Sequence, residues 1–273
     1  MVFSSMFGGG GAPQVRAMQQ SDLGSVLRII HGYDEDDFEE AREDLAEDIE
    51  KMLVLTKGKK VIGVTGATLD PQTDGIVWLS WTYIDPAHAG QGHGRQLIGA
   101  LLDALRADGI RKLFISTSDY KDEGEDIYAN ARAFYEKLGA NLEVMLPNYH
   151  GQGESRYIYG LELVPAPSRN EHPGGGVLRF IDVEPASESE KGLALLWEEI
   201  ETDTPSETID TNLPAMIEKA RNQKARVLVA AVPSDLCLNV GAALQAAGFE
   251  HRGRLLDYFA PNIHQELGIL QLR

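Results

Sequence analysis

The sequence that decides the fold is Gly90-Gln91-Gly92-His93-Gly94-Arg95, which stands where a predicted strand gives way to a predicted helix. The strand, residues 76–84, is rich in β-branched and aromatic side chains and is stopped by Asp85-Pro86. The helix carries leucine and isoleucine at helical spacing as far as Gly109. Backbone N–H groups of alternating glycines at a helix N-terminus can converge on phosphate, and the helix dipole favours the same negative charge. The loop therefore predicts a phosphate-binding turn, with a plain tight turn as the alternative.

The spacing of these glycines excludes two other phosphate loops. A Walker loop needs Gly-Lys-Ser or Gly-Lys-Thr after four intervening residues, and no such triplet follows Gly90. The dinucleotide pattern G-x-G-x-x-G is excluded because Arg95 stands where its third glycine would lie. A nucleotide-binding protein of either class is therefore disfavoured.

The elements predicted around the loop follow one another in a regular order. Before it come a short strand, a helix, an acidic helical stretch and three strands, at residues 15–18, 21–30, 34–50, 52–56, 61–69 and 76–84. After the loop helix come a strand at 112–117, a helix ending at Gly139, and two strands that finish near residue 163. Short turns between the strands that precede the loop imply three antiparallel strands in a row.

Three segments resemble the acetyl-CoA-binding core of the GNAT superfamily, namely residues 82–86 (TYIDP), 90–95 (GQGHGR) and 133–140 (AFYEKLGA). The resemblance implies an α/β (α+β) fold of the GNAT type, in which helices flank a mixed, mostly antiparallel sheet. It implies acetyl-CoA as cosubstrate and no metal. The activity it implies is transfer of an acetyl or other short acyl group from acyl-CoA to a primary amine by direct attack, without an acyl-enzyme.

The resemblance assigns the cofactor to two stretches of the chain. Pantetheine would lie along the backbone of Thr82, Tyr83 and Ile84. The pyrophosphate would be bound by the glycine loop, which comprises Gly90, Gln91, Gly92, His93, Gly94 and Arg95. Family members carry Arg or Gln one place before the first glycine, where this chain has Ala89, and Arg95 could compensate.

Tyr135 stands where the family places the general acid that reprotonates the departing CoA thiolate. A phenol with a pKa of ~10 can donate to a thiolate of comparable basicity once both are desolvated. A core tyrosine beside Phe134 is the alternative. The family's CoA-contacting asparagine lies seven residues earlier, where this chain has Tyr128, and Asn130 is the candidate for that contact.

The general base is left open. Many relatives use a Glu at the end of the fifth strand, and this chain has a serine there, at about Ser116. Acylation needs a neutral amine, so a carboxylate or a water chain must take its proton. The candidates are Glu123, Glu125, Asp126, His88 and Tyr149.

Proline and glycine at 165–176 predict a linker, which divides the chain into a flexible tail (1–13), a GNAT domain (14–165), the linker itself (166–176) and a second domain (177–273). Residues 243–249 parallel residues 134–140 at an offset of 109, although chance similarity is the alternative. Helices are expected at 188–199 and 213–221. The second domain has no glycine cluster after a strand, and Leu244 stands at the counterpart of Tyr135. It is therefore predicted to be a smaller, degenerate GNAT-like αββ unit that binds no CoA.

Composition narrows the class of protein further. The 273 residues carry a formal net charge of −17, which disfavours nucleic acid and anionic membranes as partners. Cys237 is the only cysteine, so the chain has no intramolecular disulfide and a reducing, cytoplasmic setting is expected. We find no segment that approaches the ~20 apolar residues of a membrane span.

Two functions from different classes fit these observations. The first is an N-acetyltransferase whose acceptor is an amine-bearing small molecule or peptide, with a homodimer possible. The second is a catalytically silent acyl-CoA-binding sensor or dimerisation module. The intact Tyr135 and glycine loop favour the enzyme.

Overall fold

A computed structural model describes residues 12–33, 35–47, 49–165, 176–201, 211–237 and 240–272. By its internal contacts the chain divides into two compact units. Unit 1 combines Met1–Asp70 with Gly75–Leu113, and unit 2 combines Pro71–Asp74 with Phe114–Arg273. Of the predicted tail and linker, residues 1–11 and 166–175 lie outside the described residues. The domain boundaries near residues 165 and 177 stay a prediction.

Unit 1 is built on an antiparallel sheet. Its strands follow the order β1 (Gln14–Ala17), β2 (Met52–Lys57), β3 (Lys60–Leu69), β4 (Ile76–Ile84). Both β2 and β3 are buried along nearly their whole length, as expected for strands covered on both faces. The three antiparallel strands that the sequence predicted are therefore confirmed.

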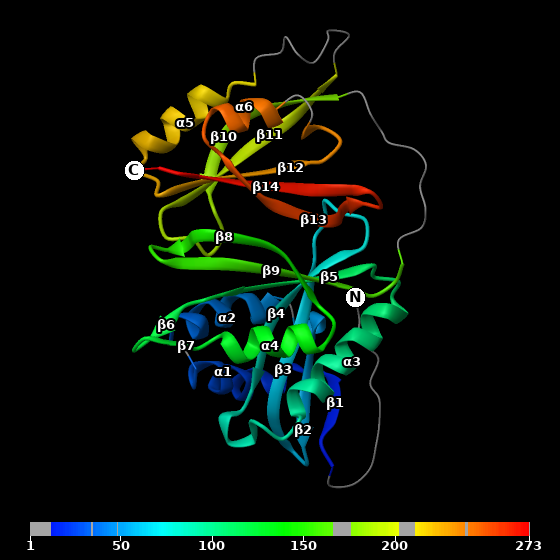
Figure 1. The fold of residues 1–273 in the computed structure, drawn as a ribbon. Helices are drawn as coiled ribbons and strands as arrows, with labels where there is room; N and C mark the ends of the chain where they lie inside the picture. The colour runs from blue at the N-terminus through cyan, green and yellow to red at the C-terminus, as the bar shows by residue number, and fades with distance from the viewer. Residues whose placement is uncertain are drawn as a thin grey trace. The chain divides into compact units, whose positions relative to one another are not determined.

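Three α-helices accompany this sheet, α1 (Leu23–His31), α2 (Glu35–Glu47) and α3 (His93–Ala107), together with the short turns η1 (Gln20–Asp22), η2 (Ile49–Lys51) and η3 (Pro86–His88) (Figure 1). The buried side of α3 carries Leu97, Ile98, Leu101, Leu102 and Leu105, the apolar stripe that its sequence spacing predicts. No helix in the described part of the chain combines the length and apolar character needed to cross a membrane.

A β-bulge interrupts β4 near its end. Ser80 pairs with Gly66 and Tyr83 with Val64, so Trp81 and Thr82 together face the single residue Thr65. Trp81 adopts a positive φ of 35°, which is uncommon for a bulky side chain. The hydroxyls of Thr82 and Thr65 lie 2.8 Å apart and bridge the bulge. A bulge bends the strand and increases its twist, so the last residues of β4 are re-aimed.

Unit 2 contains a mixed sheet. Its elements are β5 (Lys112–Ser118, from Phe114 onward), the small hairpin β6 (Lys121–Asp122) and β7 (Glu125–Asp126), α4 (Ala129–Lys137), β8 (Asn141–Gly151), β9 (Glu154–Glu162), β10 (Gly176–Pro185), β11 (Gly192–Glu201), α5 (Leu213–Asn222), β12 (Val227–Pro233), α6 (Gly241–Ala246), β13 (Glu250–Ala260) and β14 (Ile263–Gln271). The strands that follow β9 in the sheet run in the order β8-β13-β14-β12-β11-β10, and β11 runs parallel to β12.

The helix predicted at 213–221 is confirmed as α5, but the helix predicted at 188–199 is wrong. This segment forms β11, which pairs antiparallel with β10 and parallel with β12. Leu193 and Leu195 are buried whereas Ala194 and Leu196 between and after them are less so, the period-two pattern of a strand. Two strand neighbours thus override the helix propensity of a leucine-rich run.

Two hairpins of unit 2 repeat each other at an offset of 109 residues. Strands β13 and β14 begin and end at the counterparts of the first and last residues of β8 and β9. Every described register pair of one hairpin has its counterpart in the other, and the register shifts coincide. Even the turn is shared, because the Gly153 N–H donates to Asn148 Oδ1 at 2.8 Å and the Asn262 N–H to Asp257 Oδ1 at 2.7 Å.

The two hairpins also meet in the sheet. Val144 of β8 pairs with Gly253 of β13, its own counterpart at the offset of 109. An antiparallel pairing of equivalent positions is the geometry of a local two-fold axis. The repeat is thus a feature of backbone and register, while the assignment of the second domain to a degenerate GNAT unit stays a prediction.

Replacing Gly253 with alanine is predicted to destabilise the protein by about 1–3 kcal/mol. A Cβ there would lie 2.7 Å from the Glu143 carbonyl oxygen, and the residue has a φ of +131° that side chains rarely adopt. Urea unfolding would measure the loss. Gly24→Ala is the control, since no atom lies within 4 Å of its added Cβ, and it should keep or slightly raise the stability. A Gly253→Ala variant as stable as the wild type would contradict the register described for β8 and β13.

Candidate active site

The glycine loop of unit 1 links η3 to α3. Gly90 and Gly92 have φ angles of 71° and 80°, the left-handed conformation that glycine adopts most readily. Gly92 is the N-cap of α3 and has no side chain with which to cap the first N–H groups of this helix. No described atom lies within 4 Å of a Cβ built on either glycine, so both glycines border open space. The loop therefore fits an anionic group such as the CoA pyrophosphate.

Asp85 fixes the start of this loop. Its carboxylate accepts a hydrogen bond of 3.0 Å from the Ala87 N–H and so caps η3. The Lys60 ammonium lies 2.7 Å from the other carboxylate oxygen. The hydrogen bond from Lys60 is the main cause of the lowered pKa of Asp85. The Asp85-Pro86 pair that ends the predicted strand is therefore held in place by an ion pair with Lys60 of β3.

The end of β4 lies against the start of α3. A Cβ on Gly94 would lie 4.0 Å from Ile84 Cγ1, so the helix N-terminus and the re-aimed strand end are neighbours. Thr82, Tyr83 and Ile84 are all partly buried. The structure thus brings together, within unit 1, the two stretches of backbone to which the resemblance assigns the cofactor.

Two side chains that the sequence did not single out contact this strand end. The Tyr33 hydroxyl donates to the Ile84 carbonyl oxygen at 2.7 Å, and the Tyr33 and Tyr83 rings lie 5.3 Å apart. The Tyr83 hydroxyl donates to the Asp37 carboxylate of α2. Asp37 belongs to an acidic run whose pattern does not distinguish it from its neighbours. No sequence signal could have singled it out, because the contact depends on the bulge in β4.

The other loop side chains divide into exposed and partly buried groups. Gln91 and Arg95 are exposed, whereas His93 is partly buried. The His93 and His88 rings lie 6.2 Å apart. One nitrogen of each ring is buried and has no hydrogen-bond partner among the residues that the structure describes. Because Arg95 is exposed, its side chain can reach a ligand from solvent, as its proposed compensating role requires.

Tyr135 lies on α4 in unit 2 and is partly buried between Phe134 and Tyr159, whose ring centroids are 5.8 and 6.4 Å away. Burial, assisted by Tyr128, raises the pKa of Tyr135 to about 12. The phenol is therefore fully protonated at neutral pH and available as a donor. Asn130, on the same helix, is exposed.

Two of the candidates for the general base, Asp126 and Tyr149, already make contacts with other groups of the protein. The Arg132 guanidinium pairs with the Asp126 carboxylate and lowers its pKa. The Tyr149 hydroxyl is buried, donates to the Ser187 carbonyl oxygen at 2.9 Å and accepts from Arg156 at 2.8 Å. Tyr149 therefore has a structural role.

Three further residues at and after the end of β5 bear on the general base. Ser116, in place of the family's Glu, accepts a 2.8 Å hydrogen bond from Arg156 Nε. Glu123 and Glu125 are exposed in the hairpin of β6 and β7. Their exposure therefore favours neither Glu123 nor Glu125 over the other as the base.

Comparison with known proteins identifies this arrangement. Residues 16–140 match the family described as Acetyltransferase (GNAT) family. This part of the chain is a GNAT domain, and it contains both the glycine loop and Tyr135. The predicted fold class, a mixed and mostly antiparallel sheet with flanking helices, is confirmed.

Two relatives illustrate the similarity. An amino-acid acetyltransferase from Aeromonas salmonicida (strain A449) is 27% identical over 109 residues, which are 39% of this chain and 24% of that protein. The match thus spans about a quarter of the relative's length. A solved GNAT-family structure from Desulfovibrio desulfuricans is 26% identical with a TM-score of 0.51, and the match covers 56% of this chain and all of that one.

Replacing Asp85 with asparagine is predicted to lower stability at pH 7 by up to about 1 kcal/mol, because Lys60 is largely exposed. The folded pKa of Asp85 lies below its ordinary value of 3.8, so its charge stabilises the fold above that pH. This contribution is lost as the pH falls through the folded pKa. Urea unfolding of both proteins from pH 7 to pH 3 would measure the difference, which should decrease as the pH falls below 3.8.

Asp103→Asn serves as the control, because Asp103 pairs with Arg106 on the exposed side of α3. This variant should match the wild type at every pH. A difference between Asp85→Asn and the wild type that stays constant down to pH 3 would show that the charge of Asp85 does not anchor the loop.

Proposed function

We propose that the protein is an N-acetyltransferase that transfers an acetyl or other short acyl group from acyl-CoA to a primary amine by direct attack. The observation that carries the proposal is the glycine loop, whose left-handed glycines border open space at the N-terminus of α3. It lies within the segment that matches the acetyltransferase family. The single cysteine agrees with a reducing, cytoplasmic setting.

In this proposal the backbone amides from Gln91 to Arg95 bind the pyrophosphate, with Gly90 providing the turn, and the strand end at Thr82, Tyr83 and Ile84 orients the pantetheine. Arg95 supplies the positive charge that Ala89 cannot. Hydrogen bonds from a preorganised loop need no rearrangement when the cofactor binds. Asn130 is exposed and remains the candidate for a further CoA contact.

The proposed reaction forms one bond and breaks one. The neutral amine attacks the thioester carbonyl carbon, the C–N bond forms, and the C–S bond breaks to release the CoA thiolate. Tyr135 donates its phenolic proton to the thiolate, and a base takes the proton of the amine nitrogen. With a pKa of about 12, Tyr135 is protonated at neutral pH and has this proton to donate.

The rival function is a silent acyl-CoA sensor or dimerisation module. A catalytically silent module would be expected to lack the general acid, whereas this chain keeps Tyr135. Acceptors in the proposal are an amine-bearing small molecule or a peptide. The acidic face of α2, with Asp37 beside the strand end, favours a cationic acceptor.

Release of CoA thiol from acetyl-CoA, measured across a panel of amines and peptides, tests the proposal. At least one acceptor should raise the release above the rate of hydrolysis. Binding of acetyl-CoA with no acceleration by any acceptor would favour the sensor.

Tyr135→Phe is predicted to lower kcat by ~10-fold or more with little change in acetyl-CoA affinity, because the acid acts only as the thiolate forms. Steady-state kinetics and calorimetry measure the two quantities. The exposed Tyr120 offers a matched control, and Tyr120→Phe should keep wild-type kinetics. Unchanged turnover in Tyr135→Phe would remove this residue from the mechanism.

Gly92→Val is predicted to abolish measurable CoA binding. A β-branched residue disfavours the φ of 80° at the N-cap of α3 and fills the space in front of the amides. Gly99→Ala, in the middle of α3 where no atom lies within 4 Å of the new Cβ, should bind CoA normally. An ordinary CoA dissociation constant for Gly92→Val would place the pyrophosphate elsewhere.

A further inference from the structure

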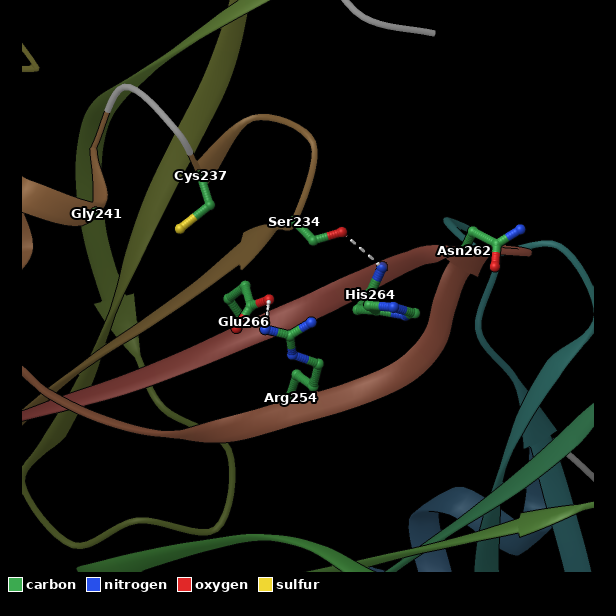
Figure 2. Close-up of a pocket in the computed structure, with 7 residues that line it drawn as sticks. All are labelled: Ser234, Cys237, Gly241, Arg254, Asn262, His264 and Glu266. Atoms are coloured by element: carbon green, nitrogen blue, oxygen red, sulfur yellow. Dashed lines mark hydrogen bonds and ion pairs between the residues drawn. The ribbon is translucent and has the colours of Figure 1, made fainter. Parts of the chain in front are cut away.

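A pocket of about 580 Å³ lies entirely within unit 2. It opens where β12 ends, beside the start of α6 and the paired strands β13 and β14 (Figure 2). Its lining includes Ser234, Gly241, Arg254, Asn262, His264 and Glu266. This volume is in the range of small-molecule sites. None of these residues belongs to the proposed acetyl-CoA site.

The repeat explains why the pocket exists. At the offset of 109 residues, Gly241 corresponds to Arg132 and Glu266 to Tyr157. In the first copy the Arg132 guanidinium stacks over the Tyr157 ring at 5.0 Å. The second copy keeps the backbone but has no side chain at Gly241 and no ring at Glu266. The space that the stacked pair occupies beside α4 and β9 is therefore open beside α6 and β14.

One further contact shows that the two places are equivalent. In the first copy the Ser155 N–H donates to the Asp119 side chain at 2.6 Å. In the second the His264 N–H donates to Ser234 Oγ at 2.9 Å. His264 is the counterpart of Ser155 in the hairpin repeat, and Ser234 follows β12 as Asp119 follows β5. The position that the Asp119 carboxylate occupies in the first copy is thus taken by the Ser234 hydroxyl in the pocket.

Glu266, the carboxylate in the lining, is paired with Arg254 and His251. Glu266 is buried, and its two oxygens lie 3.1 Å from Arg254 Nη2 and 2.7 Å from His251 Nε2. Arg254 is half-exposed and has five N–H groups, of which this pair engages only a part. Glu266 therefore holds the guanidinium in place without exhausting its capacity to donate.

The remaining polar groups of the lining are hydrogen-bond donors. His264 Nδ1 accepts a 2.8 Å hydrogen bond from the Asp257 N–H, so in the neutral ring the proton sits on Nε2. Ser234 accepts through its oxygen and keeps its O–H for another partner. Asn262 adds an amide that can donate. Figure 2 shows Ser234, His264 and Arg254 grouped together, with Asn262 farther out beyond His264.

We propose that this pocket binds a small oxyanion, the carboxylate or phosphate group of a compact metabolite, with Arg254 as its ionic partner. Guanidinium groups match the planar, two-oxygen geometry of carboxylate and phosphate. His264 and Ser234 supply further donors, and the pairing of Glu266 with Arg254 and His251 reduces its repulsion of the ligand. The site is separate from acyl transfer, so its test does not depend on the proposed function.

Calorimetry on the full chain, without CoA, tests the proposal with two probes, succinate for carboxylates and inorganic phosphate for phosphates. At least one probe should bind saturably, and the tighter one identifies the ligand class. Arg254→Gln removes the charge, and Gly241→Leu fills the space without changing any charge. Each variant should weaken binding at least tenfold.

The matched control is Arg179→Gln on the exposed side of β10. It should bind the probe as the wild type does, and thermal unfolding confirms that all three variants fold. No saturable binding of either probe overturns the proposal. Binding that Arg254→Gln and Gly241→Leu leave unchanged overturns it as well, because the anion then lies elsewhere.

Discussion

The β-bulge in β4 is the constraint on which the proposed cofactor site depends. Trp81 and Thr82 face one residue of β3, and the hydrogen bond between Thr82 and Thr65 bridges the irregularity. A positive φ at a tryptophan costs free energy and persists only when its surroundings hold it in place. Beyond the bulge, Tyr83 and Ile84 reach α2, Tyr33 and the start of α3. The glycine loop is thereby placed beside the end of β4.

The loop itself could be predicted from the sequence, and the bulge could not. Alternating glycines before an amphipathic helix leave few conformations, and the structure gives Gly90 and Gly92 the left-handed φ angles that such a loop requires. A bulge arises from the register between two strands, which the sequence of neither strand specifies alone. The contacts of Tyr33 and Asp37 follow from it, so they too escaped sequence analysis. Tyr135 could be named from its motif, but its raised pKa is a property of its burial.

The second half of the chain shows the same division between what the sequence predicts and what it does not. A handful of matching positions was enough to predict an offset of 109, and the structure extends that match to the register and turns of two hairpins. The leucine-rich segment 188–199 was wrongly predicted as a helix, because short apolar runs suit either structure until their neighbours are known. A shared backbone then carries different side chains, stacked at Arg132 and Tyr157 and open at Gly241 and Glu266.

The central claim is that the chain binds CoA once, at the glycine loop of the GNAT domain, and that the repeated second half provides no second site. Isothermal titration of CoA into the full-length protein tests this claim directly through the stoichiometry. The account predicts one CoA per chain. Two CoA molecules per chain, or saturable binding that persists unchanged when the glycine loop is disrupted, would contradict it.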